Sequence, residues 1–244
     1  ELFLVLIINA FTLFYVDENE LNPEPAVKIY GMDTPEFLTG KNDYYSDTNF
    51  IEIPASLAYR TKMFLLKDTY SAFSKMNTAA KKDGISLKII SAARTFEEQK
   101  WIWEDKWIKY KQSQPGETQR AEYIMHYSAM PGTSRHHWGT EIDLNSTSEN
   151  YFKSGTGKKV YDWLVKNAGT YGFCQTYDEK GAGRSVGYNE EKWHWSYYPL
   201  SNKLLKKYKE KVKYADIKGF SGDGAAEDLD VINNYVLSIS NDCE

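Results

Sequence analysis

The stretch Ser134-Arg-His-His-Trp-Gly-Thr-Glu-Ile-Asp143 does the most to decide the fold. Gly139 marks a turn, and residues 140–144 are typical of a short strand. His136 and Asp143 are seven positions apart, which is too far for one helix face to present both to one ion. The stretch therefore predicts a loop and a strand that fold an imidazole and a carboxylate back toward one point.

A second stretch, Glu191-Lys-Trp-His-Trp195, opens an aromatic strand predicted over residues 192–198. His136, Asp143 and His194 supply three ligands of a catalytic zinc site, which leaves a fourth position open. Glu191 is a spare carboxylate that can carry protons. Glu191 and His194 would point to opposite faces of a flat strand, so this arrangement needs Glu191 at the strand entrance. For each histidine taken alone, a structural role is the more common one.

The rest of the chain alternates helical patterns with short strands. A helix over 56–82 has Met63, Leu66, Tyr70, Phe73 and Met76 on one face and stops at Asp83-Gly84. Further helices are predicted over 95–110, 118–127, 158–167, 201–213 and 228–239, and a strand over 85–90. Thr95 and Glu98 form a capping-box pattern. Without a regular βαβ period, this order favours an α+β fold with a small antiparallel sheet.

Composition limits the classes of partner. The chain has 244 residues, a net charge of -4 and 15% aromatic residues. This length suits one domain, and the mild acidity argues against nucleic-acid binding, which needs a basic face. The one basic run, 203–213, reads as a solvated helix face. No stable protein partner is inferred.

The first residues bear on the compartment. Residues 2–16 are apolar and uncharged, match a signal-peptide core in length, and are shorter than the about 20 residues of a membrane span. They are interpreted as a signal or anchor remnant (1–16), with a buried strand pair as the alternative. Residues 17–55 are expected to form an extended lead-in, and 56–244 the domain with a C-terminal helical extension. Cys174 and Cys243 would pair in an exported protein and stay thiols in the cytosol.

Three motifs in this order carry a family resemblance. They are Ser91-x-x-Arg94-x-x-x-x-Gln99, Ser134-x-His136-x-x-Gly139-x-x-x-Asp143 and Glu191-x-Trp193-His194. Together they resemble the D-alanyl-D-alanine carboxypeptidases of the vancomycin-resistance type, which are grouped with D-Ala-D-Ala dipeptidases and the zinc-bearing domain of hedgehog proteins. The resemblance covers about residues 56–198. It implies a small antiparallel sheet with flanking helices and a zinc cleft on the sheet.

The resemblance also implies residue roles. His136, Asp143 and His194 would bind one zinc ion per chain, and Glu191 would be the general base. Arg94 would stabilise the substrate carbonyl oxygen or bind its terminal carboxylate. The expected substrate contacts are Arg94, Ser134, Gln99 and Trp193; the alternatives are a capped helix start at 91–95 and a packing role for Gln99. Two positions depart from the family pattern, His137 and Lys192. His137 lines the cleft or replaces His136 as ligand, and the spacing to Asp143 favours His136.

The function implied is a zinc metallopeptidase outside the cytoplasm, a D,D-carboxypeptidase that removes the terminal D-Ala of peptidoglycan stem peptides. Alternatives with the same chemistry are an L,D-carboxypeptidase and a peptidoglycan endopeptidase. An exopeptidase must capture a terminal carboxylate, so a cleft closed beyond Arg94 would favour a carboxypeptidase over an endopeptidase. A non-catalytic zinc-binding recognition module is the alternative from another class, and Glu191 speaks against it because a binding module needs no base. A structural domain without chemistry is the last alternative.

Overall fold

The protein is described by a computed structural model that places residues 29, 31–181 and 183–244. Its main sheet has four antiparallel strands in the order β3-β4-β6-β5. Their bounds are Ile89–Ser91 for β3, Glu141–Leu144 for β4, Phe173–Gln175 for β5 and His194–Tyr197 for β6. A separate antiparallel pair joins β1 (Phe50–Glu52) to β2 (Phe64–Leu66). The predicted α+β class with a small antiparallel sheet is confirmed.

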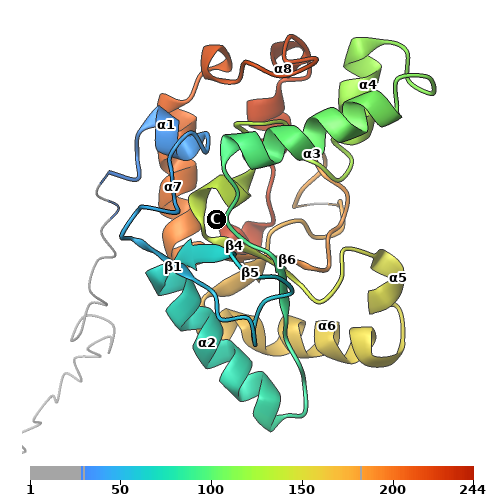
Figure 1. Ribbon diagram of the computed structural model, residues 1–244. Coiled ribbons are helices and arrows are strands. Elements are labelled where there is room, and N and C mark those ends of the chain that lie inside the picture. The colour runs from blue at the N-terminus through green and yellow to red at the C-terminus, as the bar shows by residue number, and fades with distance from the viewer. Residues whose placement is uncertain (1–28, 30, 182) are drawn as a thin grey trace, which may run out of the picture.

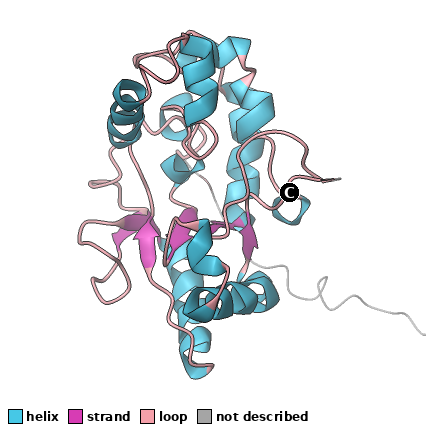
Figure 2. Ribbon diagram, turned by 90° about the vertical axis from the view of Figure 1, so that its right-hand side faces the viewer, coloured by secondary structure: helices cyan, strands magenta, loops and turns pink. Residues whose placement is uncertain are grey.

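Helices cover both sides of the sheet. Figure 1 shows α2 and α6 below the strands and α3, α4 and α8 above them, and Figure 2 shows the strands as a band between the two layers. The bounds are α1 Pro35–Leu38, α2 Lys67–Lys82, α3 Phe96–Lys109, α4 Glu117–Ile124, α5 Glu149–Phe152, α6 Gly155–Asn167, α7 Tyr198–Lys211 and α8 Ala225–Asp228. Short 3-10 turns occupy Arg135–Trp138, Ala168–Tyr171, Tyr214–Asp216 and Asn241–Cys243, and a π-helical turn occupies Ile232–Val236.

Side-chain alternation on β4 and β6 separates an apolar face from a polar one. Ile142 lies opposite Trp195, and both are buried in a core with side chains of α2 and α6. Asp143 lies opposite His194, one residue along each strand. Because successive side chains of a strand point to opposite faces, Asp143 and His194 share the face turned away from α2 and α6.

The predicted helix after Ser91 is confirmed at both ends. Thr95 caps α3: its hydroxyl accepts from the Glu98 amide, the Glu98 carboxylate accepts from the Thr95 amide, and Tyr110 closes the helix. The predicted start of α2 was wrong, because residues 64–66 form β2 and the helix begins at Lys67. The apolar residues of 56–66 serve a strand and turns, and Leu66 N–H donates to the Gly139 carbonyl oxygen rather than within a helix. Asp83 and Gly84 end α2 as predicted.

The predicted closing helix over 228–239 is not a regular α-helix. α8 ends at Asp228, and Asp230 has a φ of 46°, a left-handed conformation that interrupts a right-handed helix. The chain then makes the π-helical turn before reaching the C-terminus. A disulfide joins Cys243 to Cys174 of β5, with their Cα atoms 5.5 Å apart. This is the pairing expected of an exported chain.

The N-terminal prediction falls mainly on residues 1–28 and 30, which lie outside the described part of the chain. From residue 31 onward the lead-in contains α1 and β1, and its Phe37 and Phe50 belong to the same core as Trp138 of the 3-10 turn. The boundary between 55 and 56 stays a prediction. Within the described residues, no helix combines the length and apolarity needed to cross a bilayer.

Candidate active site

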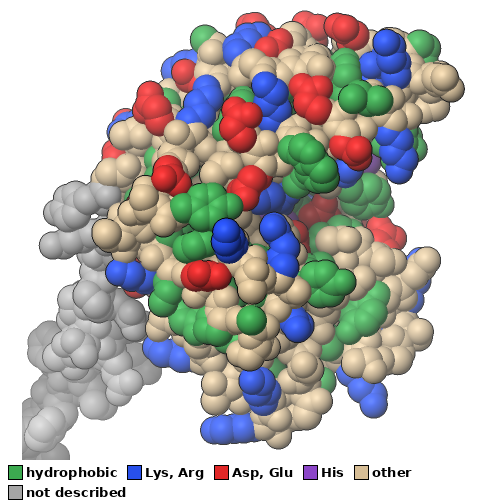
Figure 3. All heavy atoms as spheres, viewed as in Figure 1, with side chains coloured by type: hydrophobic (Ala, Val, Ile, Leu, Met, Phe, Trp, Pro, Cys, Tyr) green, Lys and Arg blue, Asp and Glu red, His purple; other side chains and the backbone are tan. Residues whose placement is uncertain are grey.

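A cavity of about 540 Å³ opens on the polar face of the sheet. Figure 3 shows the molecular surface hollowed below α3, with acidic side chains visible in its depth. The lining residues are Ser91, Arg94, Ile102, Lys106, Tyr127, Ser128, Ala129, Ser134, Arg135, His136, Asp143, Thr147, Glu149, Tyr177, Tyr188, Glu191, Trp193 and His194. Seven of the eight residues predicted for the site line this cavity; Gln99 is the exception.

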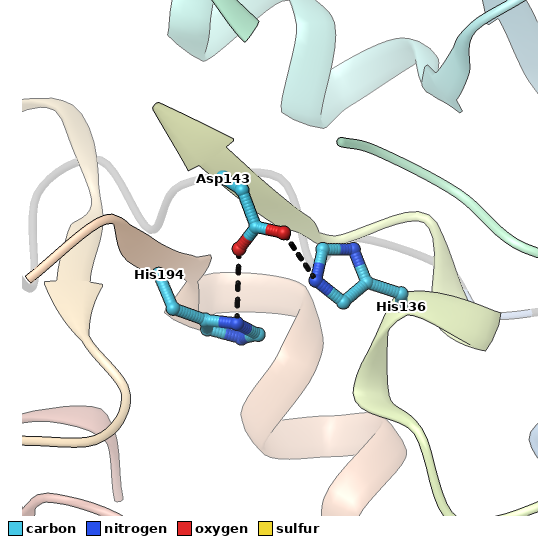
Figure 4. Close-up of side chains that lie close together, drawn as sticks. All are labelled: His136, Asp143 and His194. Atoms are coloured by element: carbon cyan, nitrogen blue, oxygen red, sulfur yellow. Dashed lines mark ion pairs between the residues drawn. The ribbon is translucent and has the colours of Figure 1, made fainter. Parts of the chain in front are cut away.

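Three side chains converge on the cavity floor, as Figure 4 shows. His136 comes from the 3-10 turn, Asp143 from β4 and His194 from β6. His136 Nε2 lies 3.4 Å from Asp143 Oδ2, and His194 Nδ1 lies 3.2 Å from Asp143 Oδ1. One ligand atom from each of the three lies within 4.8 Å of the other two. The distance between His194 Nδ1 and Asp143 Oδ1 follows from strand pairing, because Asp143 and His194 are register partners.

The donor set fits a zinc ion. Donors bound tetrahedrally at about 2.0–2.1 Å from one ion lie roughly 3.3 Å apart, close to the 3.4 Å and 3.2 Å between each imidazole nitrogen and its nearer Asp143 oxygen. His136 Nε2 and Asp143 Oδ1 are buried and make no hydrogen bond within the described structure. Buried polar atoms are almost always paired, so two unpaired ones that face each other's side chains indicate a site built for a cation. Two imidazoles and one carboxylate are a common ligand set of catalytic zinc sites.

Both histidines are held by their other ring nitrogen. His136 Nδ1 donates to the Ala92 carbonyl oxygen at 2.7 Å, which leaves Nε2 as the acceptor that faces Asp143. His194 Nε2 donates to Glu141 Oε2 at 2.9 Å, which leaves Nδ1 facing Asp143. Hydrogen bonds of this kind fix the tautomer and the ring orientation of histidines that bind metals. When each imidazole holds a single proton, the structure therefore presents two imidazole lone pairs and a carboxylate to one point.

The charges at this point are strongly coupled. Burial and the nearby Arg94 together lower the pKa of His136 to about 4, so its imidazole is neutral near pH 7. Burial also opposes the charged form of His194, but Asp143, Glu141 and Glu191 together raise its pKa well above the ordinary value. Burial alone would raise the pKa of Asp143, yet the two histidines lower it below its usual range. A neutral His136 and an ionised Asp143 are in the protonation states that metal binding requires.

Glu191 occupies the strand entrance that its predicted role requires. Its N–H donates to the Tyr177 carbonyl oxygen at 2.9 Å, and its carbonyl oxygen accepts from the His194 N–H at 3.1 Å. This turn brings Glu191 Oε2 to 3.4 Å from His194 Nδ1, on the same side as Asp143. Burial raises the pKa of Glu191, an effect that His194 opposes. A buried carboxylate with a raised pKa beside a candidate metal centre has the properties of a general base.

Arg94 is half-buried at the cavity wall and held from several directions. Its N–H donates to the His136 carbonyl oxygen, and its own carbonyl oxygen accepts from His137 Nδ1. Its guanidinium donates to Gln99 Oε1 at 2.9 Å, while Nε has no hydrogen-bond partner among the described groups. Gln99 Nε2 donates in turn to the Ala129 carbonyl oxygen. Gln99 therefore lies behind Arg94 and supports it, and direct contact between Gln99 and a substrate stays a prediction.

His137 is a structural side chain. It is fully buried, its Nδ1 donates to the Arg94 carbonyl oxygen at 2.8 Å, and its Nε2 accepts from the Gly132 N–H at 3.1 Å. Both ring nitrogens are thus used, and His137 does not line the cavity. A Cβ atom added to Gly40 would lie 2.2 Å from His137 Nδ1, so a glycine is needed where the chain passes this ring.

Sequence reasoning left several residues of the site without a role. Glu141 and Arg135 lie inside the quoted motif and form a fully buried ion pair of 3.2 Å beneath His194. Alternation along the strand could have placed Glu141 beside Asp143, two positions later, on the same face. Lys106 reaches the cavity from α3, and no sequence motif marks it.

Comparisons with known proteins agree with this geometry. The profile of the family described as VanY, D-alanyl-D-alanine carboxypeptidase, matches residues 62–200. A D-alanyl-D-alanine carboxypeptidase of Enterococcus faecalis (strain ATCC 700802 / V583) is 32% identical over 119 residues, which cover 49% of this chain and 42% of that protein. YodJ of Bacillus subtilis (strain 168) is 30% identical over 162 residues, which cover 62% of this chain and 56% of YodJ. The chain spans about half the length of these relatives.

Two solved structures share the fold. A vancomycin-resistance D,D-pentapeptidase VanY variant, in complex with Zn(II), superposes with a TM-score of 0.51 at 23% identity over 73% of this chain and 89% of that one. The LD-carboxypeptidase LdcB gives 0.51 at 22% identity over 70% of this chain and 81% of that one. The arrangement of sheet and helices is thus that of the VanY-like peptidases. The chain belongs to the D-alanyl-D-alanine carboxypeptidase family VanY.

Proposed function

We propose that this protein is a zinc-dependent D,D-carboxypeptidase that removes the terminal D-Ala of peptidoglycan stem peptides. One observation carries the proposal: the free ligand atoms of His136, Asp143 and His194 converge in a cavity, with the buried Glu191 carboxylate 3.4 Å from His194 Nδ1. One zinc ion per chain fits this set. Glu191 is not one of the three proposed ligands, so its carboxylate is free to act as a base. A recognition module needs no base, so Glu191 favours an enzyme.

The chain's own groups have separate tasks in the proposed reaction. When bound, zinc supplies a Lewis acid that polarises a carbonyl group and makes water more acidic. Glu191 takes the proton of the attacking water and passes it to the leaving amine. Arg94, fixed by Gln99, offers a planar positive group to the substrate carbonyl oxygen or terminal carboxylate. Ser134 and Trp193 line the cavity and orient the peptide.

Two unpaired cations favour an exopeptidase over an endopeptidase. Arg94 and Lys106 both line the cavity, and neither has an acidic partner within 4.0 Å among the described residues. Lys106 Nζ donates to the neutral Ser128 hydroxyl, and burial together with Arg94 lowers the pKa of Lys106. Like charges held together in a partly buried cavity repel each other, so an incoming carboxylate is attracted to them. The free C-terminus of a stem peptide supplies that carboxylate.

The proposed compartment follows from the substrate. Stem peptides lie outside the cytoplasm, and the Cys174–Cys243 disulfide is of a kind that persists in oxidising surroundings. We propose an extracytoplasmic enzyme in which residues 56–244 form the peptidase domain, with 17–55 as its lead-in and 1–16 as a signal or anchor remnant. The peptidoglycan stem peptide is its only proposed partner.

A peptide panel tests the activity. The zinc-loaded chain is incubated with peptides that end in D-Ala-D-Ala, in L-Lys-D-Ala, and in D-Ala-D-Ala-amide, and products are identified by mass spectrometry. We expect loss of one D-Ala from the first peptide. Preferred cleavage of the second would overturn D,D-specificity in favour of an L,D-carboxypeptidase, and equal cleavage of the amide would favour an endopeptidase. Zinc binding without cleavage of any peptide would support the recognition module.

The proposed role of Glu191 as general base is tested by comparing it with its neighbour Glu190. Glu191→Gln keeps size and polarity but cannot accept a proton, so kcat is expected to fall roughly 100- to 10,000-fold with zinc retained. Glu190→Gln is the matched control, because Glu190 is the preceding residue and pairs with Lys192 at 3.3 Å outside the cavity lining. Near-full activity of Glu191→Gln, or an equal loss in Glu190→Gln, would refute the assignment.

The proposed binding of the substrate's terminal carboxylate by Lys106 is tested with two lysine variants of α3. Lys106→Met should raise KM for the free peptide about ten- to hundredfold, the effect of losing one hydrogen bond to a charged group, and leave the slow reaction of the amide unchanged. Lys109→Met, an exposed position of α3, is the control and should change neither. Equal effects of Lys106→Met on the free peptide and the amide would refute a role in carboxylate binding.

A further inference from the structure

A buried polar network lies directly behind His194. Glu141 is fully buried, and its Oε2 accepts from His194 Nε2 at 2.9 Å. Its other oxygen, Oε1, lies 3.2 Å from a terminal nitrogen of Arg135, which is also fully buried. Oε1 also accepts from Ser196 Oγ at 2.7 Å, and Thr176 Oγ1 donates to Oε2 at 3.2 Å. Both carboxylate oxygens are thus fully engaged in fixed directions.

Strand register and the preceding turn build this network. Glu141 and Asp143 lie two positions apart on β4, so they share a face, and their register partners on β6 are Ser196 and His194. Arg135 comes from the 3-10 turn that carries His136, and its guanidinium stacks over the Trp138 ring at 4.7 Å. One short segment thus supplies a proposed zinc ligand and the cation that holds Glu141.

We propose that Glu141, held in place by Arg135, is a positioning residue that fixes the tautomer of His194 and so keeps the His194 Nδ1 lone pair available to the metal. This inference rests on the proposed zinc site. It assigns a function to two buried charged residues that lie behind the proposed zinc ligands.

The chemistry of the three groups leads to this assignment. A neutral imidazole carries one N–H, and an ionised carboxylate can only accept hydrogen bonds. Facing Glu141, His194 must carry its proton on Nε2, and its lone pair then lies on Nδ1, toward Asp143 and Glu191. Arg135 holds a permanent positive charge 3.2 Å from Oε1. It stops Glu141 from turning away and balances its charge in a region closed to water.

The same geometry predicts what an amide would do in place of the carboxylate. In Glu141→Gln, the positive charge of Arg135 beside the Oε1 position attracts the amide oxygen and repels the amide NH₂ group, so the oxygen goes there. The NH₂ group then faces His194 Nε2 and forces that nitrogen to accept. The imidazole proton moves to Nδ1 and occupies the lone pair that zinc needs.

The inference is tested by zinc affinity, measured by chelator competition on the full chain, together with imidazole ¹⁵N NMR of the tautomer. Glu141→Gln should weaken zinc binding about 10- to 100-fold, the usual effect of losing a group that orients a ligand. Thr176→Val is the matched control, because it removes a buried hydrogen bond to the same Glu141 oxygen but leaves the bond from His194. It should bind zinc like the wild type.

A pair of double variants separates the tautomer effect from misfolding. Arg135→Met with Glu141→Gln removes the buried cation and lets the amide oxygen turn to His194 Nε2–H, so zinc affinity should recover toward the wild type. Arg135→Met with Glu141→Met offers no acceptor and should stay weak. Equal affinities of these two, or a Thr176→Val loss as large as that of Glu141→Gln, would overturn the inference. A wild-type chain that binds no zinc would overturn the proposed function itself.

Discussion

Removing the disulfide tests how the C-terminal segment contributes to stability. The bridge closes a loop between residues 69 positions apart and ties the last turn of the chain to β5. The chain-entropy relation for a loop of this length gives about 4 kcal/mol of stabilisation through the unfolded state. For a domain of 150–250 residues, each kcal/mol shifts Tm by about 2–4 °C, so Cys174→Ala with Cys243→Ala should lower Tm by roughly 8–16 °C.

Metal binding should survive this change. The proposed ligands come from the 3-10 turn, β4 and β6. The C-terminal segment instead packs behind the cavity wall, where the Tyr235 ring lies 5.1 Å from that of Tyr188 and the Ser240 N–H donates to the Thr176 carbonyl oxygen. Zinc affinity is therefore expected to stay within about threefold, since no ligand or its hydrogen-bond partner is removed.

The assay is calorimetric unfolding of the metal-free chain with and without a reductant. The wild type in reductant should unfold at the Tm of the double variant, and the double variant itself should not respond to reductant. A Tm decrease below about 2 °C would show that the unfolded-state argument fails for this loop. A response of the double variant to reductant would mean that the reductant acts elsewhere.

Other predictions concern the site. His136→Ala should abolish zinc loading, whereas His137→Ala should still load zinc. The His137→Ala variant should unfold at a lower temperature, because the Gly132 N–H and the Arg94 carbonyl oxygen lose their hydrogen-bond partner. Elemental analysis measures the zinc content of both variants, and thermal unfolding measures their stability. Arg94→Lys keeps the charge but loses the planar fork that holds Gln99, so steady-state kinetics should show a lower kcat and a higher KM. Three carboxylates raise the pKa of His194, so zinc must displace a proton from this imidazole. Zinc affinity should therefore fall about tenfold per pH unit as the pH decreases below that pKa. Zinc titrations at several pH values that show no such decrease would contradict this prediction.

Local sequence patterns predicted those features that depend on neighbours along the chain. The capping box at Thr95 and Glu98 and the stop at Asp83-Gly84 appear as expected, because side-chain caps and left-handed glycines act within one turn of the backbone. The aromatic strand ending in Tyr197 and the antiparallel sheet were also predicted. The three ordered motifs predicted the family, since each fixes residue types at fixed spacing.

Element boundaries were predicted less well, for a physical reason. Apolar residues at three- and four-residue steps over 56–66 fit a helix, but pairing with β1 makes residues 64–66 a strand. Over 228–239 the pattern also fits a helix, yet Asp230 adopts a left-handed conformation and the chain continues as a π-helical turn. In both places the contacts that decide the conformation come from outside the segment.

The sequence by itself determined which residue types the site would contain, the sheet-and-helix class and the family. Only the tertiary structure decided what each side chain faces. Both ring nitrogens of His137 are hydrogen-bonded to backbone groups, and Gln99 lies behind Arg94. Glu141 and Arg135 form an ion pair behind His194. Lys106 enters the cavity from a part of α3 that lies beyond the motif ending at Gln99, and Cys243 reaches Cys174 across 69 positions. A side chain's protonation, orientation and role depend on the groups across from it, and the packing of distant segments brings those groups there.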